Sequence, residues 1–205
     1  FNVLFLGFAC SNFAVGYFTT ATKIYIIFIG LIAAFNGVLV PHLNSLIGQG
    51  NIDEFKYKVS LSFSVVSTLA MPFMFFAFFL APEIIRLVAG EGYEPAILPF
   101  RIVSLQIILV GFAQITENQI LLSLKKFKEV LYCTLASTIL SIIILVTMAH
   151  DYAEVASALA VALPHFVECI LLFYYAKKSI FFSFPIKELG KNFLLSIPIG
   201  GMCVL

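Results

Sequence analysis

Two ionisable side chains stand inside a long apolar stretch, where burial makes them costly. Glu168 and His165 lie in the stretch 152–176, among alanine, valine, leucine, isoleucine and phenylalanine. At about 100° per residue of an α-helix, they share one side of the helix with Glu154, Ser157 and Pro164. A polar stripe of this kind indicates either a wet pathway or hydrogen bonding between neighbouring helices.

Glu168 is the strongest candidate functional residue. An acidic side chain at the bilayer centre costs roughly 2.5–3.5 kcal/mol on insertion scales. Such a group persists more easily where it takes up and releases a proton, or holds a cation. Pro164 removes one helical hydrogen bond and can kink the helix. The alternative is that Glu168 and His165 only hydrogen-bond to neighbouring helices as packing contacts.

A broader polar arc runs along the stretch 96–124. Its members include Ser104, Gln106, Gln114, Glu117 and Asn118. The segment 114–119 is too polar to face lipid, so we expect it to face a cavity or another helix. Gln114, Glu117 and Asn118 are therefore candidate pathway residues. For Glu117 the alternative is a structural pairing with another span.

Two cations stand near the outer ends of predicted spans. Arg101 lies about a turn and a half from the end of its helix. Its guanidinium either snorkels to the interface or holds an anion within a cavity. Lys23 begins another apolar stretch, and it is either a snorkelling side chain or a pathway residue.

The sequence carries no catalytic or metal-binding motif. HExxH, GxSxG and a phosphate-binding loop are absent, and the four cysteines form no CxxC pair. His42, His150 and His165 are scattered over different depths, which does not suit a metal site. We expect a protein that is not an enzyme and that uses neither a cofactor nor a metal.

Composition defines the elements that must position these residues. The 205 residues are 61% hydrophobic and 11% charged, with a net charge of +1, whereas soluble domains are about 25% charged. This excludes an ordinary soluble enzyme, a disordered tail and a nucleic-acid binder. The uniformly apolar runs favour helices over barrel strands. We predict an all-α polytopic membrane protein with spans at 1–9, 23–46, 59–81, 96–124, 130–149, 152–176 and 189–205.

The distribution of lysine predicts the orientation of these spans. Nine of the twelve basic residues fall in alternate connections, which the positive-inside rule places in the cytoplasm. They are Lys56, Lys58, Lys125, Lys126, Lys128, Lys177, Lys178, Lys187 and Lys191. Segments 10–22, 82–95 and 150–153 are then expected to face outward.

Segment 51–58 precedes the third span. Asn51 can cap a helix that has Asp53 and Glu54 in its first turn. We expect a short interfacial helix here, with a plain loop as the alternative.

Several short motifs resemble those of one family of membrane transporters. They are VGYFTTATKI at 15–24, VPHL at 40–43, AGEGYEPA at 89–96, NQIL at 118–121 ahead of Lys125 and Lys126, and ASALA at 156–160 followed by Glu168. Their order and spacing resemble the Wzx-type O-antigen and polysaccharide flippases. These belong to the multidrug/oligosaccharidyl-lipid/polysaccharide exporter superfamily.

The resemblance implies a fold and a function. It predicts the second six-helix bundle of a two-bundle exporter plus the start of a further helix, with an N-terminal bundle missing from this sequence. It implies alternating-access flipping of an undecaprenyl-diphosphate-linked oligosaccharide across the bacterial inner (plasma) membrane, with or without coupling to an ion or a proton. The implied partners are the lipid-linked oligosaccharide, membrane lipid, a polysaccharide polymerase and a chain-length regulator, with no nucleic acid.

Other functions stay open at this point. The same superfamily contains multidrug exporters and exporters of peptidoglycan precursors. An intramembrane polysaccharide polymerase is expected to carry a long outward loop with arginines, whereas segment 82–95 holds only Arg86. A purely structural membrane subunit is disfavoured by two polar stripes at membrane depth.

Overall fold

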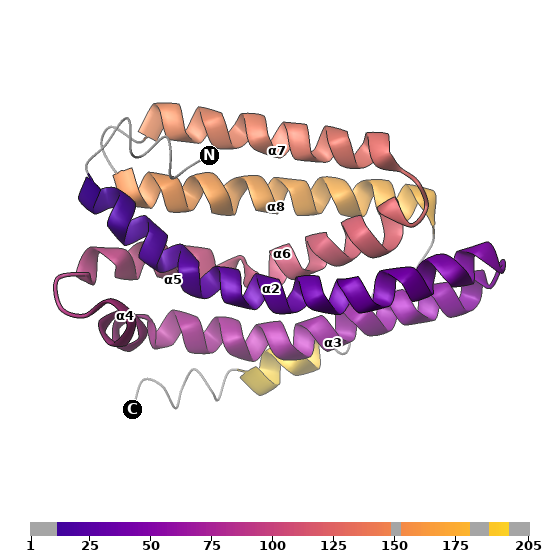
Figure 1. Ribbon diagram of the computed structural model, residues 1–205, viewed down its shortest axis with the longest axis horizontal. Helices are drawn as coiled ribbons and strands as arrows, with labels where there is room; N and C mark the ends of the chain where they lie inside the picture. The colour runs from indigo at the N-terminus through magenta and orange to yellow at the C-terminus, as the bar shows by residue number, and fades with distance from the viewer. Residues whose placement is uncertain (1–11, 149–152, 181–188, 197–205) are drawn as a thin grey trace.

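The protein is an elongated bundle of helices that share one long axis (Figure 1). The structure is a computed structural model and describes residues 12–148, 153–180 and 189–196. Over these residues, all regular structure is helical. Five helical segments within them are long and apolar enough to cross a membrane: 15–48, 52–79, 94–122, 127–148 and 156–179. The prediction of an all-α polytopic membrane protein is confirmed.

The first two described helices form an antiparallel pair. Helix α2 covers Asn12–Gly48 and α3 covers Ile52–Phe79. Segment 51–58, predicted as a short interfacial helix, is instead the start of the continuous helix α3. The Asn51 side chain accepts a hydrogen bond from the Glu54 amide at 3.3 Å. Helix α2 begins well before the predicted start at Lys23. Segment 12–22 contains no proline, and Thr19 and Thr22 bond to carbonyls of their own helix, so nothing ends the helix there.

A short turn region leads into the fourth span. Helix α4 covers Ala81–Ala89, and the 3₁₀ turn η1 covers Glu94–Ala96. Between them Gly90 and Gly92 adopt φ of 83° and 90°. Glycine enters this left-handed region without the steric cost of a Cβ. The turn region therefore lies inside segment 82–95, the connection predicted to face outward.

The fourth span is segmented, although the sequence predicted one continuous helix over 96–124. Helix α5 covers Ile97–Leu105, α6 covers Ile107–Gln114, and η2 is a π-helix over Ile115–Leu122. The break falls at Gln106 without any proline or glycine at that position. A π-helix inside a transmembrane helix is uncommon, and such irregularities are frequent at functional sites.

The last two complete helices lie side by side (Figure 1). Helix α7 covers Phe127–Met148 and α8 covers Ala153–Ser179, which continues through Pro164. Residues 189–196 are helical, and the Asn192 side chain donates to Ser67 and Thr68 of α3. The predicted span 1–9, residues 149–152 with His150, and residues 197–205 lie outside the described part of the chain.

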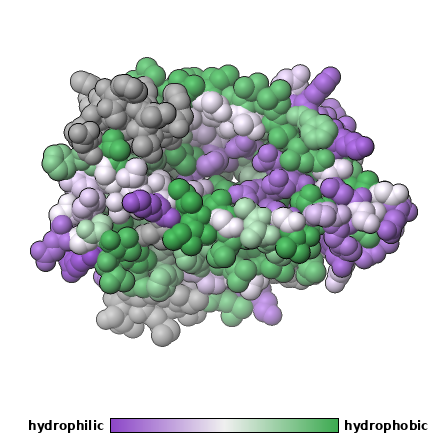
Figure 2. Space-filling model, viewed as in Figure 1, coloured by the Kyte–Doolittle hydropathy of each residue, from purple (hydrophilic) through white to green (hydrophobic). Residues whose placement is uncertain are grey.

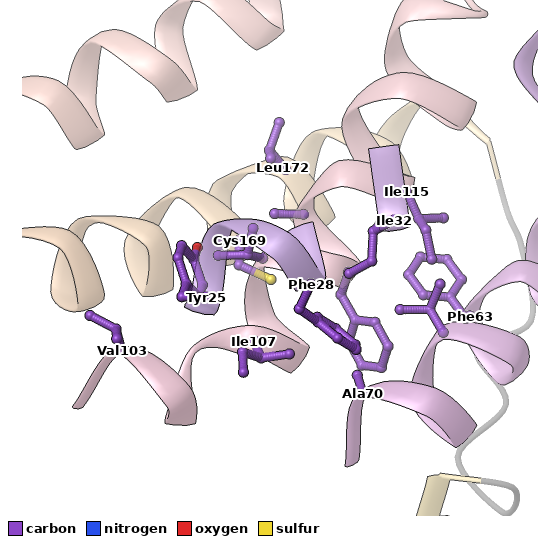
Figure 3. Packing of buried hydrophobic residues seen from close by; sticks show 14 of the residues in the cluster. Tyr25, Phe28, Ile32, Phe63, Ala70, Val103, Ile107, Ile115, Cys169 and Leu172 are labelled. Atoms are coloured by element: carbon purple, nitrogen blue, oxygen red, sulfur yellow. The ribbon is translucent and has the colours of Figure 1, made fainter. Parts of the chain in front are cut away.

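The hydrophobic core lies between α2, α3, the fourth span and α8. Figure 3 shows Phe28 and Ile32 of α2 beside Phe63 of α3, with Ile107 and Cys169 on the neighbouring helices. Gly111 allows close packing here. A Cβ at Gly111 would lie 2.8 Å from Val66 Cγ1 and 3.1 Å from Ile32 Cδ1. Most contacts of helix α7 are with α8 and few are with the other helices. Helix α7 therefore forms the edge of the bundle.

Candidate functional site: two polar clusters at membrane depth

Hydrophilic side chains gather in the middle of one face of this apolar molecule. In Figure 2 they lie between the hydrophobic surface over α7 and the hydrophobic surface over α2. Two cavities whose linings include polar side chains are associated with these helices. One, of about 360 Å³, lies between α2 and the α6–η2 segment, and the other, of about 210 Å³, lies between α7 and α8.

The first cluster consists of carboxamides and joins α2 to the fourth span. We call Asn36, Gln114, Asn118 and Gln119 the amide cluster. Gln119 Nε2 donates to Asn36 Oδ1 at 2.8 Å, and Asn36 Nδ2 donates to Gln114 Oε1 at 3.4 Å. Asn118 donates to the Gln114 carbonyl at 2.9 Å. Asn36 and Gln119 are buried, so these bonds replace water for groups that lipid cannot solvate.

The second cluster contains both intramembrane carboxylates of the described spans. We call Glu117, Glu168, Thr134 and Ser137 the carboxylate cluster. The Thr134 hydroxyl donates to Glu168 Oε1 at 3.3 Å, and Ser137, whose hydroxyl donates to the Thr134 carbonyl, lies close to Glu168. The charges of Glu117 and Glu168 lie within electrostatic range of each other. Both carboxylates are partly exposed, whereas Asn36 and Gln119 of the amide cluster are buried.

His165 joins α8 to the break in the fourth span. Its Nδ1 lies 3.0 Å from Gln106 Oε1, so this nitrogen carries the proton if the amide is oriented as described. Gln106 is only 2% exposed, and its Nε2 has no hydrogen-bond partner. The contact crosses from the residue after Pro164 to the residue where α5 ends and α6 begins. This contact connects His165 of α8 to the residue between α5 and α6.

A stripe of hydroxyls on α7 was missed in the sequence. It consists of Thr134, Ser137, Thr138 and Ser141. Their spacing of i, i+3, i+4 and i+7 places them on one helix face, and this periodicity was the available signal. Ser137, Thr138 and Ser141 also line the 210 Å³ cavity with His165. Each of the three donates to a backbone carbonyl, at 3.0, 2.8 and 2.6 Å respectively.

These hydroxyls present a defined chemistry to the cavity. A hydroxyl has one hydrogen to donate and lone pairs that accept. Because the hydrogens of Ser137, Thr138 and Ser141 point to carbonyls, their lone pairs remain for a solute. The adjacent Glu168 adds further acceptors. This wall suits water, a cation or a polyhydroxylated solute that donates hydrogen bonds.

The two candidate cations do not join either cluster. Arg101 Nε donates to the Phe78 carbonyl at 3.2 Å, and the guanidinium carbon lies 5.6 Å from the centre of the Phe78 ring. Arg101 therefore occupies the C-terminal end of α3, where helix carbonyls attract a positive charge. Lys23 is exposed on α2, about 20 Å along the helix from Asn36. The side chain of Glu154 lies outside the described residues.

The sequence-predicted residues thus separate into two groups. Glu117, Glu168 and the α7 hydroxyls come together, as do Gln114 and Asn118 with Asn36. Arg101 and Lys23 stand apart from both. Among the residues that the structure describes, no three potential metal ligands converge.

One of three comparisons with known proteins gives a match. Residues 1–98 match a family described as "Polysaccharide biosynthesis protein", and this region ends at the second residue of α5. The match confirms the resemblance to polysaccharide biosynthesis proteins over this region and supports a role in polysaccharide biosynthesis or export. Searches of curated proteins and of solved structures found no match.

Proposed function

We propose that the protein is a transporter that flips an undecaprenyl-diphosphate-linked oligosaccharide across the bacterial inner membrane by alternating access. The described helices provide one wall of the pathway, and the protein catalyses no covalent reaction. The observation that carries the proposal is the combination of the family match at residues 1–98 with polar clusters at membrane depth.

The chemistry of the wall indicates which part of the substrate it meets. Acceptor groups on α7 and the carboxylates of Glu117 and Glu168 attract donors and cations. They repel a diphosphate. The glycan therefore passes along α7 and the carboxylate cluster, while the anionic diphosphate is held by groups outside these two clusters.

Glu168 couples this movement to a proton or a cation. A ligand shifts a conformational equilibrium only through different affinities for the two states. A carboxylate that moves between a wet and a dry environment supplies that difference. The Thr134 hydroxyl donates to Glu168 Oε1 in the state described here. Closing the cavity would change the access of water to the Glu168 carboxylate.

A deletion strain tests the proposal. Cells that lack the full-length protein should accumulate lipid-linked repeat units on the inner leaflet and lose surface polysaccharide. The polymerase and the chain-length regulator, the partners expected downstream, should remain present. Normal surface polysaccharide together with increased sensitivity to dyes would favour a multidrug exporter and contradict the proposal.

A further inference from the structure

Helix α8 carries a second feature on the side opposite its polar stripe. An open groove of about 540 Å³ runs along it and is bordered by Leu109 of α6. Phe166 and Ile170 each stand two residues from Glu168, which places them about 160° around the helix from that carboxylate. The groove therefore does not belong to the polar clusters described above.

The groove is apolar along its length and ends at a cation. Phe166, Ile170 and Tyr174 are 49%, 53% and 62% exposed, so their side chains face the surroundings of the bundle. Lys177 closes the groove at the last turn of α8. Within the part of the chain that the structure describes, Lys177 forms no ion pair.

The dimensions match one leaflet of a bilayer. From Phe166 to Lys177 the helix rises about 17 Å. Half of a hydrocarbon core of about 30 Å is about 15 Å. Tyr174 lies one turn before Lys177, at the level where tyrosine is enriched between chains and headgroups. The lysine distribution predicts that this end faces the cytoplasm.

We propose that this groove is a binding site for an anionic phospholipid of the cytoplasmic leaflet. An acyl chain lies along Phe166, Ile170 and Phe173, and the headgroup phosphate pairs with Lys177. An anionic phospholipid fits this groove in two respects. Its headgroup charge complements Lys177, and its acyl chain matches the length of the apolar wall, which is about one leaflet. The site is independent of the flipping function proposed above.

Lipid-dependent stability of the full-length protein tests the site. The delipidated protein in detergent is titrated with phosphatidylglycerol or with phosphatidylcholine of the same acyl chains, and its Tm is followed. We expect phosphatidylglycerol to raise the Tm at lower concentrations than phosphatidylcholine. Lys177→Gln should weaken the phosphatidylglycerol effect about fivefold, the influence of one lysine near an anionic lipid surface.

Two further variants separate the site from general attraction to membranes. Lys178→Gln removes the same charge from the adjacent residue, which does not line the groove, and should keep the lipid preference. Ile170→Trp fills the groove at a half-exposed position and should weaken the effect of both lipids. Its Tm without lipid should equal that of the parent protein.

Three results would overturn the proposal. The first is an equal response of the parent protein to both phospholipids. The second is an equal loss in Lys177→Gln and Lys178→Gln, which would show only surface attraction. The third is displacement of phosphatidylglycerol by undecaprenyl phosphate at a lower concentration, which would assign the groove to a polyprenyl chain.

Discussion

The amide cluster and the carboxylate cluster differ in how their polar side chains are stabilised at membrane depth. Asn36 and Gln119 are buried and bond to each other across α2 and the fourth span. Glu168 is partly exposed and accepts a hydrogen bond from the Thr134 hydroxyl on α7. Neutral amides can bond to one another without water, although Gln119 Oε1 has no hydrogen-bond partner among the described residues. A carboxylate at this depth requires water, a proton or a cation. We therefore propose that the buried Asn36–Gln119 pair serves mainly packing and that the carboxylate cluster serves transport.

The largest effect is expected at Glu168. Glu168→Gln keeps the size of the side chain and one acceptor for Thr134 but removes the titratable charge. We expect export of surface polysaccharide to fall at least tenfold while the protein inserts at normal levels and keeps its Tm. Surface polysaccharide and membrane-extracted protein are measured together.

Glu129→Gln is the matched control on α7. Glu129 pairs with Lys126 at 3.6 Å in the first turn of that helix, and a surface pair of this kind contributes about 0–1 kcal/mol. Export should stay normal. If Glu168→Gln exports like the parent protein while Glu168→Ala does not, Glu168 is a packing residue and the comparison fails.

A different outcome is expected in the amide cluster. Asn36→Leu leaves Gln119 Nε2 without its partner in a buried position. An unpaired buried polar group costs about 1–3 kcal/mol. The Tm in detergent should drop, and export should fall only as far as the amount of folded protein falls. Loss of export at an unchanged Tm would place Asn36 in the transport mechanism instead.

A smaller effect is expected where the core holds the fourth span in place. Gly111→Ala puts a Cβ 2.8 Å from Val66 Cγ1. Overpacking of this kind costs about 1–3 kcal/mol, and the better helix propensity of alanine offsets about 0.5–1 kcal/mol. The Tm should fall modestly, and Val66→Ala in the same protein should recover part of the loss. An unchanged Tm in Gly111→Ala would show that α6 and α3 separate freely.

The sequence predicted the membrane character and the carboxylate on α8 because both depend on local hydropathy. It did not predict the break in the fourth span. Gln106 is neither proline nor glycine, and its partner His165 lies 59 residues later in the chain. Segment 10–22 was predicted to face outward, so the predicted span began at Lys23. In the structure the Thr19 and Thr22 hydroxyls bond to carbonyls of their own helix, which begins at Asn12.

The positions of Arg101 and the α7 hydroxyls required tertiary structure. Both alternatives for Arg101 were compatible with its depth, and only the fold brings the Phe78 carbonyl of α3 to within 3.2 Å. Serine and threonine hydroxyls can bond to backbone carbonyls of their own helix. The stripe from Thr134 to Ser141 therefore carries no burial penalty that would have marked it as a functional site in the sequence. Its meaning depends on Glu168 and His165 of the neighbouring helix.

The central claim is that the α7–α8 cavity is wet while the opposite side of α8 faces lipid. Single cysteines at Thr138 and at Ile170 test it in full-length protein whose native cysteines are replaced. Both positions are exposed, but Thr138 lines the polar cavity and Ile170 lines the apolar groove. The account predicts that a charged, water-soluble maleimide labels Thr138→Cys in intact membranes and leaves Ile170→Cys unlabelled. Equal labelling of the two, or labelling of Ile170→Cys alone, would contradict it.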